Sequence, residues 1–180
     1  LQTAGKVRAF GVSSGDFEYI KAFSQNQKCA SLQIDYSILN RTPELEILDY
    51  CKAQDIGVII RGALAMGLLT GKFTENVSFP DDDFRHQWLT DAEQNAAFKD
   101  DLAKVEILKS LVSPERTLAQ AALAFVLKHD AVTTVIPGAR TAGQVMANLA
   151  TAEAPELSAE DMALIGRVTP PGGGRKIWPA

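Results

Sequence analysis

The sequence has few of the residues that build metal sites and disulfide frameworks. Its 180 residues include two cysteines and two histidines. Cys29 and Cys51 lack metal-type spacing, so we expect two reduced, buried thiols. His86 and His129 stand far apart with no ligand pattern around them, and we expect them to face solvent or to cap a turn. These shortages disfavour a disulfide-rich scaffold, a metal site and histidine-based catalysis.

The sequence also lacks a basic run, a signal peptide and an apolar stretch long enough to cross a membrane. The formal net charge is −4 at pH 7, which disfavours a nucleic-acid or anionic-membrane partner. With 46% hydrophobic and 22% charged residues, the composition is that of a globular domain that buries a core. We expect one cytoplasmic domain over residues 1–180 and, because the chain starts at Leu1 without a methionine, a piece of a longer protein.

Short apolar runs alternate with helical patterns along the chain. Strands are predicted over residues 7–12, 31–36, 57–61 and 133–137. Helical patterns occupy residues 16–24 and 43–54, and Pro43 suits the first turn of the second helix. The order strand, helix, strand, helix predicts an α/β fold whose strands pair in parallel through right-handed crossovers.

A long insertion separates the last two predicted strands. Residues 64–88 are rich in Gly, Pro and Asp and are predicted to be loop, with a solvated acidic run at residues 81–83. An apolar stripe then predicts an amphipathic helix, and its members are Leu102, Val105, Leu108, Leu111 and Val112. Capping-box pairs predict further helix starts at Thr117 with Gln120, Thr141 with Gln144, and Ser158 with Asp161. Residues 169–180 are predicted to be an irregular tail.

Polar residues gather where the predicted strands end. Ser13 and Ser14 follow the first strand, Gln33 lies in the second, Arg61 ends the third and Arg140 follows the fourth. In a parallel β/α assembly these ends meet at one edge, where ligands bind. Hydroxyls and an amide suit a carboxamide group, glycines let backbone N–H groups approach phosphates, and a helix start beside an arginine suits a further phosphate. The pattern predicts a nucleotide with several phosphates as the ligand.

Three motifs carry a resemblance to a known family. They are GKVRAFGVSS at residues 5–14, LAMGLLTGK at residues 64–72 and VIPGAR at residues 135–140. In order and spacing they resemble the strand-five, strand-seven and strand-eight motifs of the aldo-keto reductase family, and the resemblance runs from about residue 4 to residue 168. It implies a parallel β/α half-barrel, the C-terminal half of a TIM-type (β/α)8 barrel, in an enzyme that reduces aldehydes and ketones with NADPH.

The resemblance implies a role for each matching residue. The nicotinamide carboxamide is expected to be held by Ser13, Ser14 and Gln33. Arg61 is expected to lie against the nicotinamide ring, where an aromatic residue is common, followed by Gly62 and Ala63 in place of a common Ser-Pro pair. The pyrophosphate is expected near Leu64, Ala65, Gly67 and Lys72, with Arg85 reaching in from the insertion. The adenosine end is expected at Gly138, Arg140, Gln144 and Asn148, and Arg140 favours NADP over NAD.

The chemistry of the family is expected elsewhere. Its general acid is a tyrosine tuned by a lysine, an aspartate and usually a histidine, all in the first half of the barrel, and none of those motifs is in this chain. Tyr19 and Tyr50 are predicted on outer helices, while Tyr36 ends a strand and could face the cleft, but none is expected to replace the acid. Residues 84–88 and the tail are expected to border the substrate pocket, with Trp178 either lining it or serving as a hydrophobic anchor.

Three functions stay open on the sequence. The chain is the NADP(H)-binding half of a reductase, or an inactive half-barrel, or a regulatory NADP-binding module that resembles the β subunits of potassium channels. A half-barrel leaves two unpaired strand edges and an uncovered apolar inner face. Two copies of the chain could pair through these edges and form one closed barrel. Several of the proposed ligand-binding residues also have a purely structural interpretation. Lys72 and Arg140 could be ordinary surface cations. Gln33 could hydrogen-bond a neighbouring backbone group, and Gln144 could only cap its helix.

Overall fold

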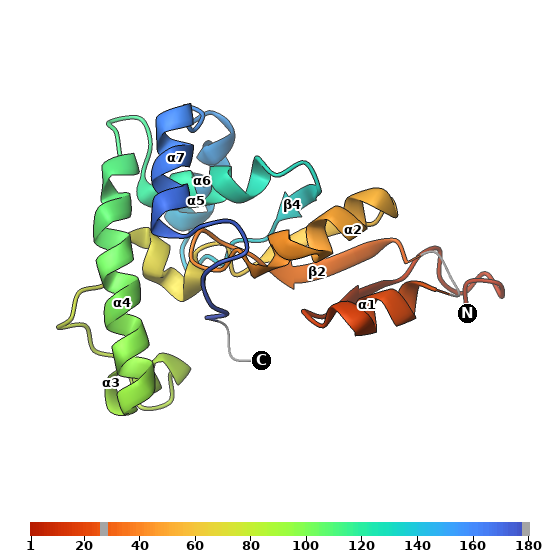
Figure 1. Ribbon diagram of the computed structural model, residues 1–180, viewed down its shortest axis with the longest axis horizontal. Helices are drawn as coiled ribbons and strands as arrows, with labels where there is room; N and C mark the ends of the chain where they lie inside the picture. The colour runs from red at the N-terminus through yellow and green to blue at the C-terminus, as the bar shows by residue number, and fades with distance from the viewer. Residues whose placement is uncertain (26–28, 178–180) are drawn as a thin grey trace.

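The computed structural model describes residues 1–25 and 29–177 (Figure 1). The described residues form one four-stranded sheet in the order β1-β2-β3-β4, and every neighbouring pair is parallel. The strands are β1 (Gly11–Ser13), β2 (Ser31–Asp35), β3 (Gly57–Arg61) and β4 (Val132–Val135). The predicted α/β fold with parallel pairing is confirmed, and β3 has the predicted bounds.

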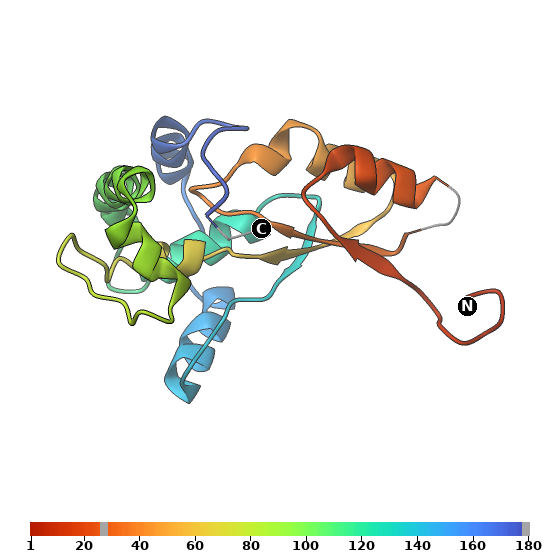
Figure 2. The same ribbon diagram turned by 90° about the horizontal axis from the view of Figure 1, so that it is seen from below.

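Helices cover one face of the sheet and gather beyond its carboxyl edge. The α-helices are α1 (Phe17–Ser24), α2 (Ile47–Ala53), α3 (Gln87–Thr90), α4 (Ala92–Leu108), α5 (Leu118–Leu127), α6 (Ala142–Leu149) and α7 (Ala159–Val168). The 3-10 helices are η1 (Thr42–Leu45), η2 (Ala65–Thr70), η3 (Phe84–His86), η4 (Lys109–Leu111) and η5 (Ala150–Ala152). Figure 2 shows α1 and α2 on one side of β1 to β3, with the other side of these strands uncovered. In the part of the chain that the structure describes, no helix is long and apolar enough to cross a membrane.

The capping residues predicted from the sequence begin most of these helices. Thr117 and Ser158 each complete a capping box, with Gln120 and Asp161 as the reciprocal partners. At α6 the predicted box is incomplete. The Thr141 hydroxyl accepts from the Gln144 N–H at 3.2 Å, but the Gln144 side chain accepts from the N–H one residue earlier, on Arg140, at 2.6 Å. Gln144 therefore ties down the loop before the helix as well as its first turn.

Two of the predicted elements are shorter than expected. The first strand covers Gly11–Ser13 rather than residues 7–12, because it pairs with β2 only where β2 has begun. The helix predicted over residues 43–54 is divided at Glu46, whose φ of −148° is not helical. It becomes the 3-10 helix η1 followed by α2. The two segments are joined at an angle that a single amphipathic pattern does not reveal.

The predicted loop of residues 64–88 has a small aromatic core of its own. The Trp88 ring stacks on Phe98 of α4 at 5.5 Å between centroids and meets Phe79 and Phe84 edge-on. Trp88 is 3% exposed, so it packs in the interior rather than lining a substrate pocket as expected. On α4 the predicted stripe is largely buried. Val112 is the exception at 48% exposed, because the helical turn ends at the residue before it.

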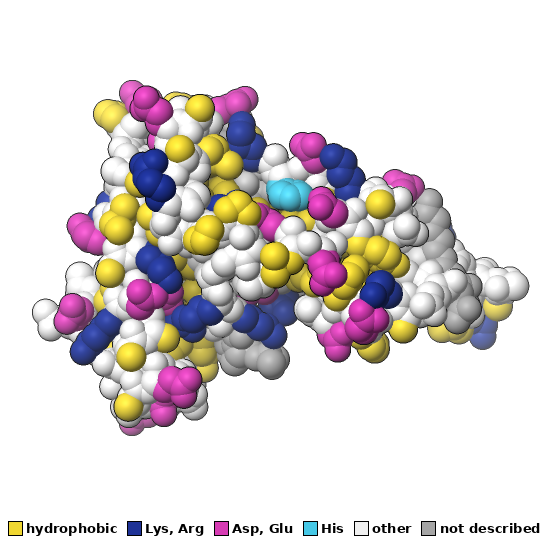
Figure 3. Space-filling view, in the orientation of Figure 1, with side chains coloured by type: hydrophobic (Ala, Val, Ile, Leu, Met, Phe, Trp, Pro, Cys, Tyr) yellow, Lys and Arg dark blue, Asp and Glu magenta, His cyan; other side chains and the backbone are white. Residues whose placement is uncertain are grey.

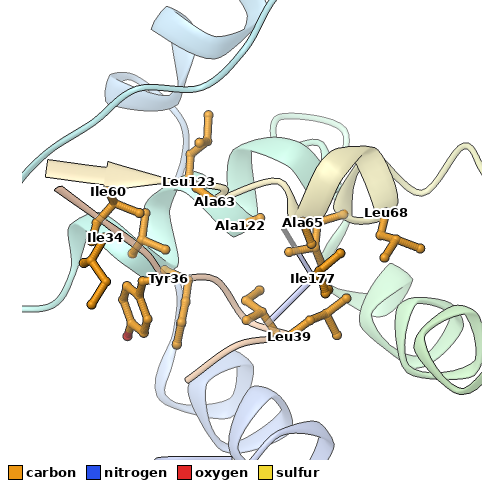
Figure 4. Close-up of a cluster of buried hydrophobic side chains, with 14 of the residues drawn as sticks. Ile34, Tyr36, Leu39, Ile60, Ala63, Ala65, Leu68, Ala122, Leu123 and Ile177 are labelled. Carbon is orange, nitrogen blue, oxygen red and sulfur yellow. The ribbon is translucent and has the colours of Figure 1, made fainter. Parts of the chain in front are cut away.

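The main core lies between the sheet and its helices. Leu32, Ile34 and Tyr36 alternate along β2 onto the helix-covered face, and each is at most 3% exposed. Figure 4 shows Ile34 and Tyr36 pointing into a cluster with residues of β3, η2 and α5. The Tyr36 hydroxyl donates to Glu44 at 2.6 Å, and its ring packs on Phe125. The expectation that Tyr36 could face the cleft is therefore wrong.

The uncovered face of the sheet is small and polar rather than apolar. Its side chains alternate with those on the helix-covered face and come from Gly11, Ser13, Ser31, Gln33, Asp35, Gly57, Ile59, Arg61 and Thr134. The prediction of an apolar inner face is therefore wrong, because Ile59 is the one large aliphatic side chain in this set. Such a face suits contact with a polar ligand better than contact with a second hydrophobic layer.

The tail is irregular, as predicted, yet it is anchored at several points. The Arg41 N–H donates to the Gly173 carbonyl at 2.8 Å, and the Arg175 N–H donates to the Leu39 carbonyl at 3.0 Å. The Arg175 guanidinium also pairs with Asp101 of α4, which is 1% exposed. The prediction for Trp178 concerns a position outside the described residues.

Candidate functional site

The carboxyl ends of β1, β2 and β3 bring the predicted polar residues together. Ser13 lies in register with Gln33, and Asp35 lies in register with Arg61. All four side chains belong to the uncovered face, because they alternate with the buried Leu32 and Ile34. The sequence prediction missed Asp35, although its position two residues after Gln33 places it on the same face. A hydroxyl, an amide, a carboxylate and a guanidinium thus share one side of the sheet.

Ser14 has a structural role at the start of α1. Its hydroxyl oxygen accepts a hydrogen bond from the Asp16 N–H at 3.1 Å, and Asp16 in turn caps the helix by accepting from the Tyr19 N–H. The Ser14 hydroxyl keeps its own proton for a second bond. The turn therefore fixes the position of the serine pair relative to the sheet.

The segment after β3 has an unusual backbone. Positive φ values occur at Gly62 (70°) and Gly67 (101°), and also at the non-glycine residues Ala65 (48°) and Met66 (55°). L-residues with side chains adopt this region at an energetic cost, and such positions concentrate at functional sites. Ala63 and Ala65 are each 2% exposed, backbone included, and their methyl groups point into the core (Figure 4). At Gly67 a Cβ would come 3.0 Å from the Phe73 ring, which gives this glycine a packing role.

Arg85 reaches the β3 segment from the insertion, as the sequence predicted. Its Nη1 donates to the Met66 carbonyl at 3.2 Å, and its other nitrogens hold Asp83 at 2.5 and 2.9 Å. The hydrogen bond from Arg85, together with a weaker contribution from the charge of Arg140, lowers the pKa of Asp83 to about 2. Asp83 therefore forms its ion pair within the insertion, with Arg85, and Arg140 acts on it only through its charge.

The loop between β4 and α6 is held by side chains of the helix. Gln144 accepts from the Arg140 N–H, and the Asn148 side chain donates to the Gly138 carbonyl at 3.4 Å. The Arg140 side chain is exposed, and a Cβ built on Gly138 would meet no atom within 4 Å. This end of the site is therefore open. Lys72 is exposed as well and follows Gly71, which packs against Leu118 of α5.

The other tyrosines, the histidines and the cysteines that the sequence raised as candidates lie outside the set of Ser13, Gln33, Asp35 and Arg61. Tyr19 is 52% exposed on α1, and Tyr50 on α2 packs edge-on against Phe17. His86 and His129 each use Nδ1 in a local backbone contact. Cys29 and Cys51 are both buried, as predicted, and neither forms a disulfide. Among the described residues, no group of three or more His, Cys, Asp or Glu side chains could hold a metal ion.

Acidic and basic side chains are interspersed over the outer surface, as the view in Figure 3 shows. Large apolar side chains are nevertheless exposed beside both outer strands. Near β1 these are Val7, Tyr19 and Phe23, and near β4 they are Ile136, Val145, Met146 and Leu149. Met146 and Leu149 are about two-thirds exposed, at 65% and 64%.

Comparison with known proteins agrees with these features. The aldo/keto reductase family model matches residues 1–169. The aldo-keto reductase YhdN of Bacillus subtilis is 32% identical over 149 residues, which cover 82% of this chain and 44% of YhdN. The NADH-specific methylglyoxal reductase of Escherichia coli is 28% identical over 155 residues, which cover 83% of this chain and 45% of that protein.

Solved structures give the same result. The glycerol dehydrogenase AKR11B4 from Gluconobacter oxydans superimposes with a TM-score of 0.74 at 28% identity, covering 94% of this chain and 52% of the dehydrogenase. An aldo-keto reductase from Klebsiella pneumoniae in complex with NADPH has a TM-score of 0.66 at 25% identity, covering 95% of this chain and 51% of that protein. The chain spans about half the length of the relatives that it matches. It belongs to the aldo/keto reductase family.

Proposed function

We propose that this chain is the NADP(H)-binding C-terminal half of a (β/α)8-barrel oxidoreductase that reduces aldehyde or ketone carbonyls by hydride transfer. The observation that carries the proposal is the row of Ser13, Gln33 and Arg61 on the uncovered face of a parallel sheet. The described tyrosines are remote from this row or engaged in packing, so the proton donor is expected from outside the chain. The chain alone is expected to be inactive, and a cytoplasmic location is part of the proposal.

The residues present fit a dinucleotide along the carboxyl edge of the sheet. Hydroxyl and amide groups at Ser13 and Gln33 match a carboxamide, which needs both donors and acceptors. At the other end Arg85 and Arg140 provide cations, and α6 begins just after Arg140. The cofactor when bound would supply the hydride, while the residues of this chain would orient it and exclude water. We also propose that the insertion, residues 64–88, covers the bound cofactor as a clasp and that Arg85 makes the contact.

Replacing Arg85 and Arg140 tests which cofactor is bound and how. Arg140→Ala is expected to weaken NADPH binding about tenfold and to leave NADH binding within about twofold, because NADH lacks the 2′-phosphate. Arg85→Gln is expected to weaken both cofactors, since a pyrophosphate is common to them. Fluorescence titration measures the affinities, with Arg167→Ala as the control for an exposed arginine in the last turn of α7.

Equal loss of NADPH and NADH affinity in Arg140→Ala would contradict the assignment of the 2′-phosphate to this end. Unchanged affinity for both cofactors in Arg85→Gln would contradict the clasp. The NADH specificity named for the Escherichia coli relative makes this comparison necessary. Deleting residues 80–88 would be a poorer test, because the deletion removes Trp88 from the aromatic core.

The exposed apolar side chains beside β1 and β4 are proposed to contact a partner unit that closes the barrel. The relatives are about twice as long as the chain, which favours a first half of the same protein as that unit. Intact mass and solution size of the protein purified from its native gene test this. A mass near twice the 19.4 kDa of this chain is expected. A mass equal to that of the chain, with the size of a dimer, would contradict it and favour two copies that rebuild one barrel.

A further inference from the structure

A buried carboxylate lies beside the proposed nicotinamide site. Asp35, at the end of β2, is 7% exposed. The Asn40 side chain, itself 3% exposed, donates to its Oδ2 at 2.9 Å. Its Oδ1 lies against the backbone of Gly62, where a Cβ would come within 1.8 Å of this oxygen. One oxygen is thus held by an amide and the other by close packing, so the carboxylate has a fixed position.

Two cations act on the charge of this carboxylate. Asp35 lies in register with Arg61, and both residues line a pocket of about 240 Å³ together with Lys176. Burial raises the pKa of Asp35 above its ordinary value, while the Asn40 hydrogen bond and the charges of Arg61 and Lys176 lower it. Because a buried carboxylate is costly without compensation, the three charged groups form one electrostatic unit.

Lys176 is held at this pocket by the anchored tail. Arg175, before it, donates its N–H to the Leu39 carbonyl at 3.0 Å and pairs with the buried Asp101. Ile177, after it, is 6% exposed and joins the core cluster in Figure 4. With both neighbours fixed, the backbone of Lys176 stays beside Asp35 although the two residues are far apart in the sequence.

The two forms of a nicotinamide cofactor differ in charge at the ring. The oxidised ring carries a positive charge and the reduced ring is neutral, so a neighbouring cation disfavours the oxidised form alone. The proposed function places this ring against Arg61, whose side chain also lines the pocket that Asp35 and Lys176 share. The charge of Arg61 disfavours the oxidised form, and the carboxylate that lies in register with Arg61 and is buried is that of Asp35, whereas Glu46 of the same pocket is exposed.

We propose that Asp35 sets the preference of this site between oxidised and reduced cofactor, because its carboxylate offsets Arg61 and Lys176 and allows the positively charged ring to bind. The inference rests on the proposed function. It assigns to Asp35 a part in cofactor discrimination, which the positions of Ser13, Gln33 and Arg61 alone do not provide.

The test compares dissociation constants for NADPH and NADP⁺ in the protein that carries this chain, expressed from its native gene. Asp35→Asn is expected to raise the ratio of the NADP⁺ to the NADPH constant about tenfold, because it removes the anion and keeps the shape. Arg61→Gln is expected to lower the same ratio. Glu46→Gln is the matched control, since Glu46 lines the same pocket with an exposed side chain, and its ratio is expected to stay within about twofold.

The outcomes separate this inference from the proposed function. If the wild-type protein binds neither NADP(H) nor NAD(H), the proposed function fails and the inference fails with it. If the wild type binds both redox forms and Asp35→Asn leaves the ratio unchanged, only the inference is overturned. Should Asp35→Asn fail to fold, which a thermal melt reports, the ratio in Arg61→Gln decides, and an unchanged ratio overturns the inference. If the protein prefers NAD(H), the same ratio is measured with that pair.

Discussion

Arg116→Ala is expected to destabilise the fold by about 3–5 kcal/mol, since it breaks a buried ion pair and leaves its partners without compensation. Arg116 is 7% exposed and precedes α5. Its guanidinium donates to the carbonyls of Leu111, Pro155 and Glu156 and to the carboxylate of Asp161, at distances from 2.8 to 3.2 Å. One side chain thus joins the end of η4, the start of α5 and the segment that leads into α7.

Urea unfolding measures this effect through the change in the free energy of unfolding. Lys52→Ala is the matched control, because the Lys52–Asp130 pair is exposed at 56% and 79%, and pairs of this kind contribute at most about 1 kcal/mol. If the free energy of unfolding of Arg116→Ala fell by less than about 1 kcal/mol, water would have to satisfy the freed carbonyls. The contacts of Arg116 would then contribute little to stability.

Gly62→Ala is expected to impair both stability and cofactor binding. The backbone at Gly62 has a φ of 70°, which costs a residue with a side chain about 1–3 kcal/mol. The new Cβ would also come 1.8 Å from Oδ1 of Asp35, so the buried carboxylate must move. Because Asp35 is held by Asn40 and faces Arg61, the displacement is expected to disturb the proposed nicotinamide site.

Gly138→Ala provides the comparison for this prediction. Gly138 also follows a strand of the sheet, but a Cβ there meets no atom within 4 Å. We expect its free energy of unfolding to change by less than about 0.5 kcal/mol, as for a surface substitution. Similar losses of stability in the two variants would contradict the role given to the Asp35 contact.

The fold could be predicted in large part because its signals are local. β3 is a continuous β-branched run bounded by glycines, and its predicted bounds are those observed. The capping boxes at Thr117 and Ser158 need residues only three positions apart. Errors arose where a second element sets the limits, as for β1, which depends on the extent of β2, and for the helix interrupted at Glu46.

The candidate site was predicted in composition but only partly in arrangement. Ser13, Gln33 and Arg61 were expected at one edge, and the register of the parallel strands places them on one face. Tyr36 was misplaced even though the alternation of Leu32, Ile34 and Tyr36 carries the signal for a buried residue. Asp35 was missed because a single carboxylate at the end of a predicted strand is usually solvent-exposed, and its burial is known only from the folded structure.

The order of strands and helices, several helix starts and the motifs of the aldo/keto reductase family can be read from the amino-acid sequence, because periodicity, capping and motif spacing depend on residues close in the chain. The folded chain is needed to show that Asp35, Arg61 and Lys176 share a pocket and that Arg116 connects η4, α5 and the segment before α7. Those contacts connect distant positions, and burial, which gives a charge its energetic weight, is a property of the whole fold.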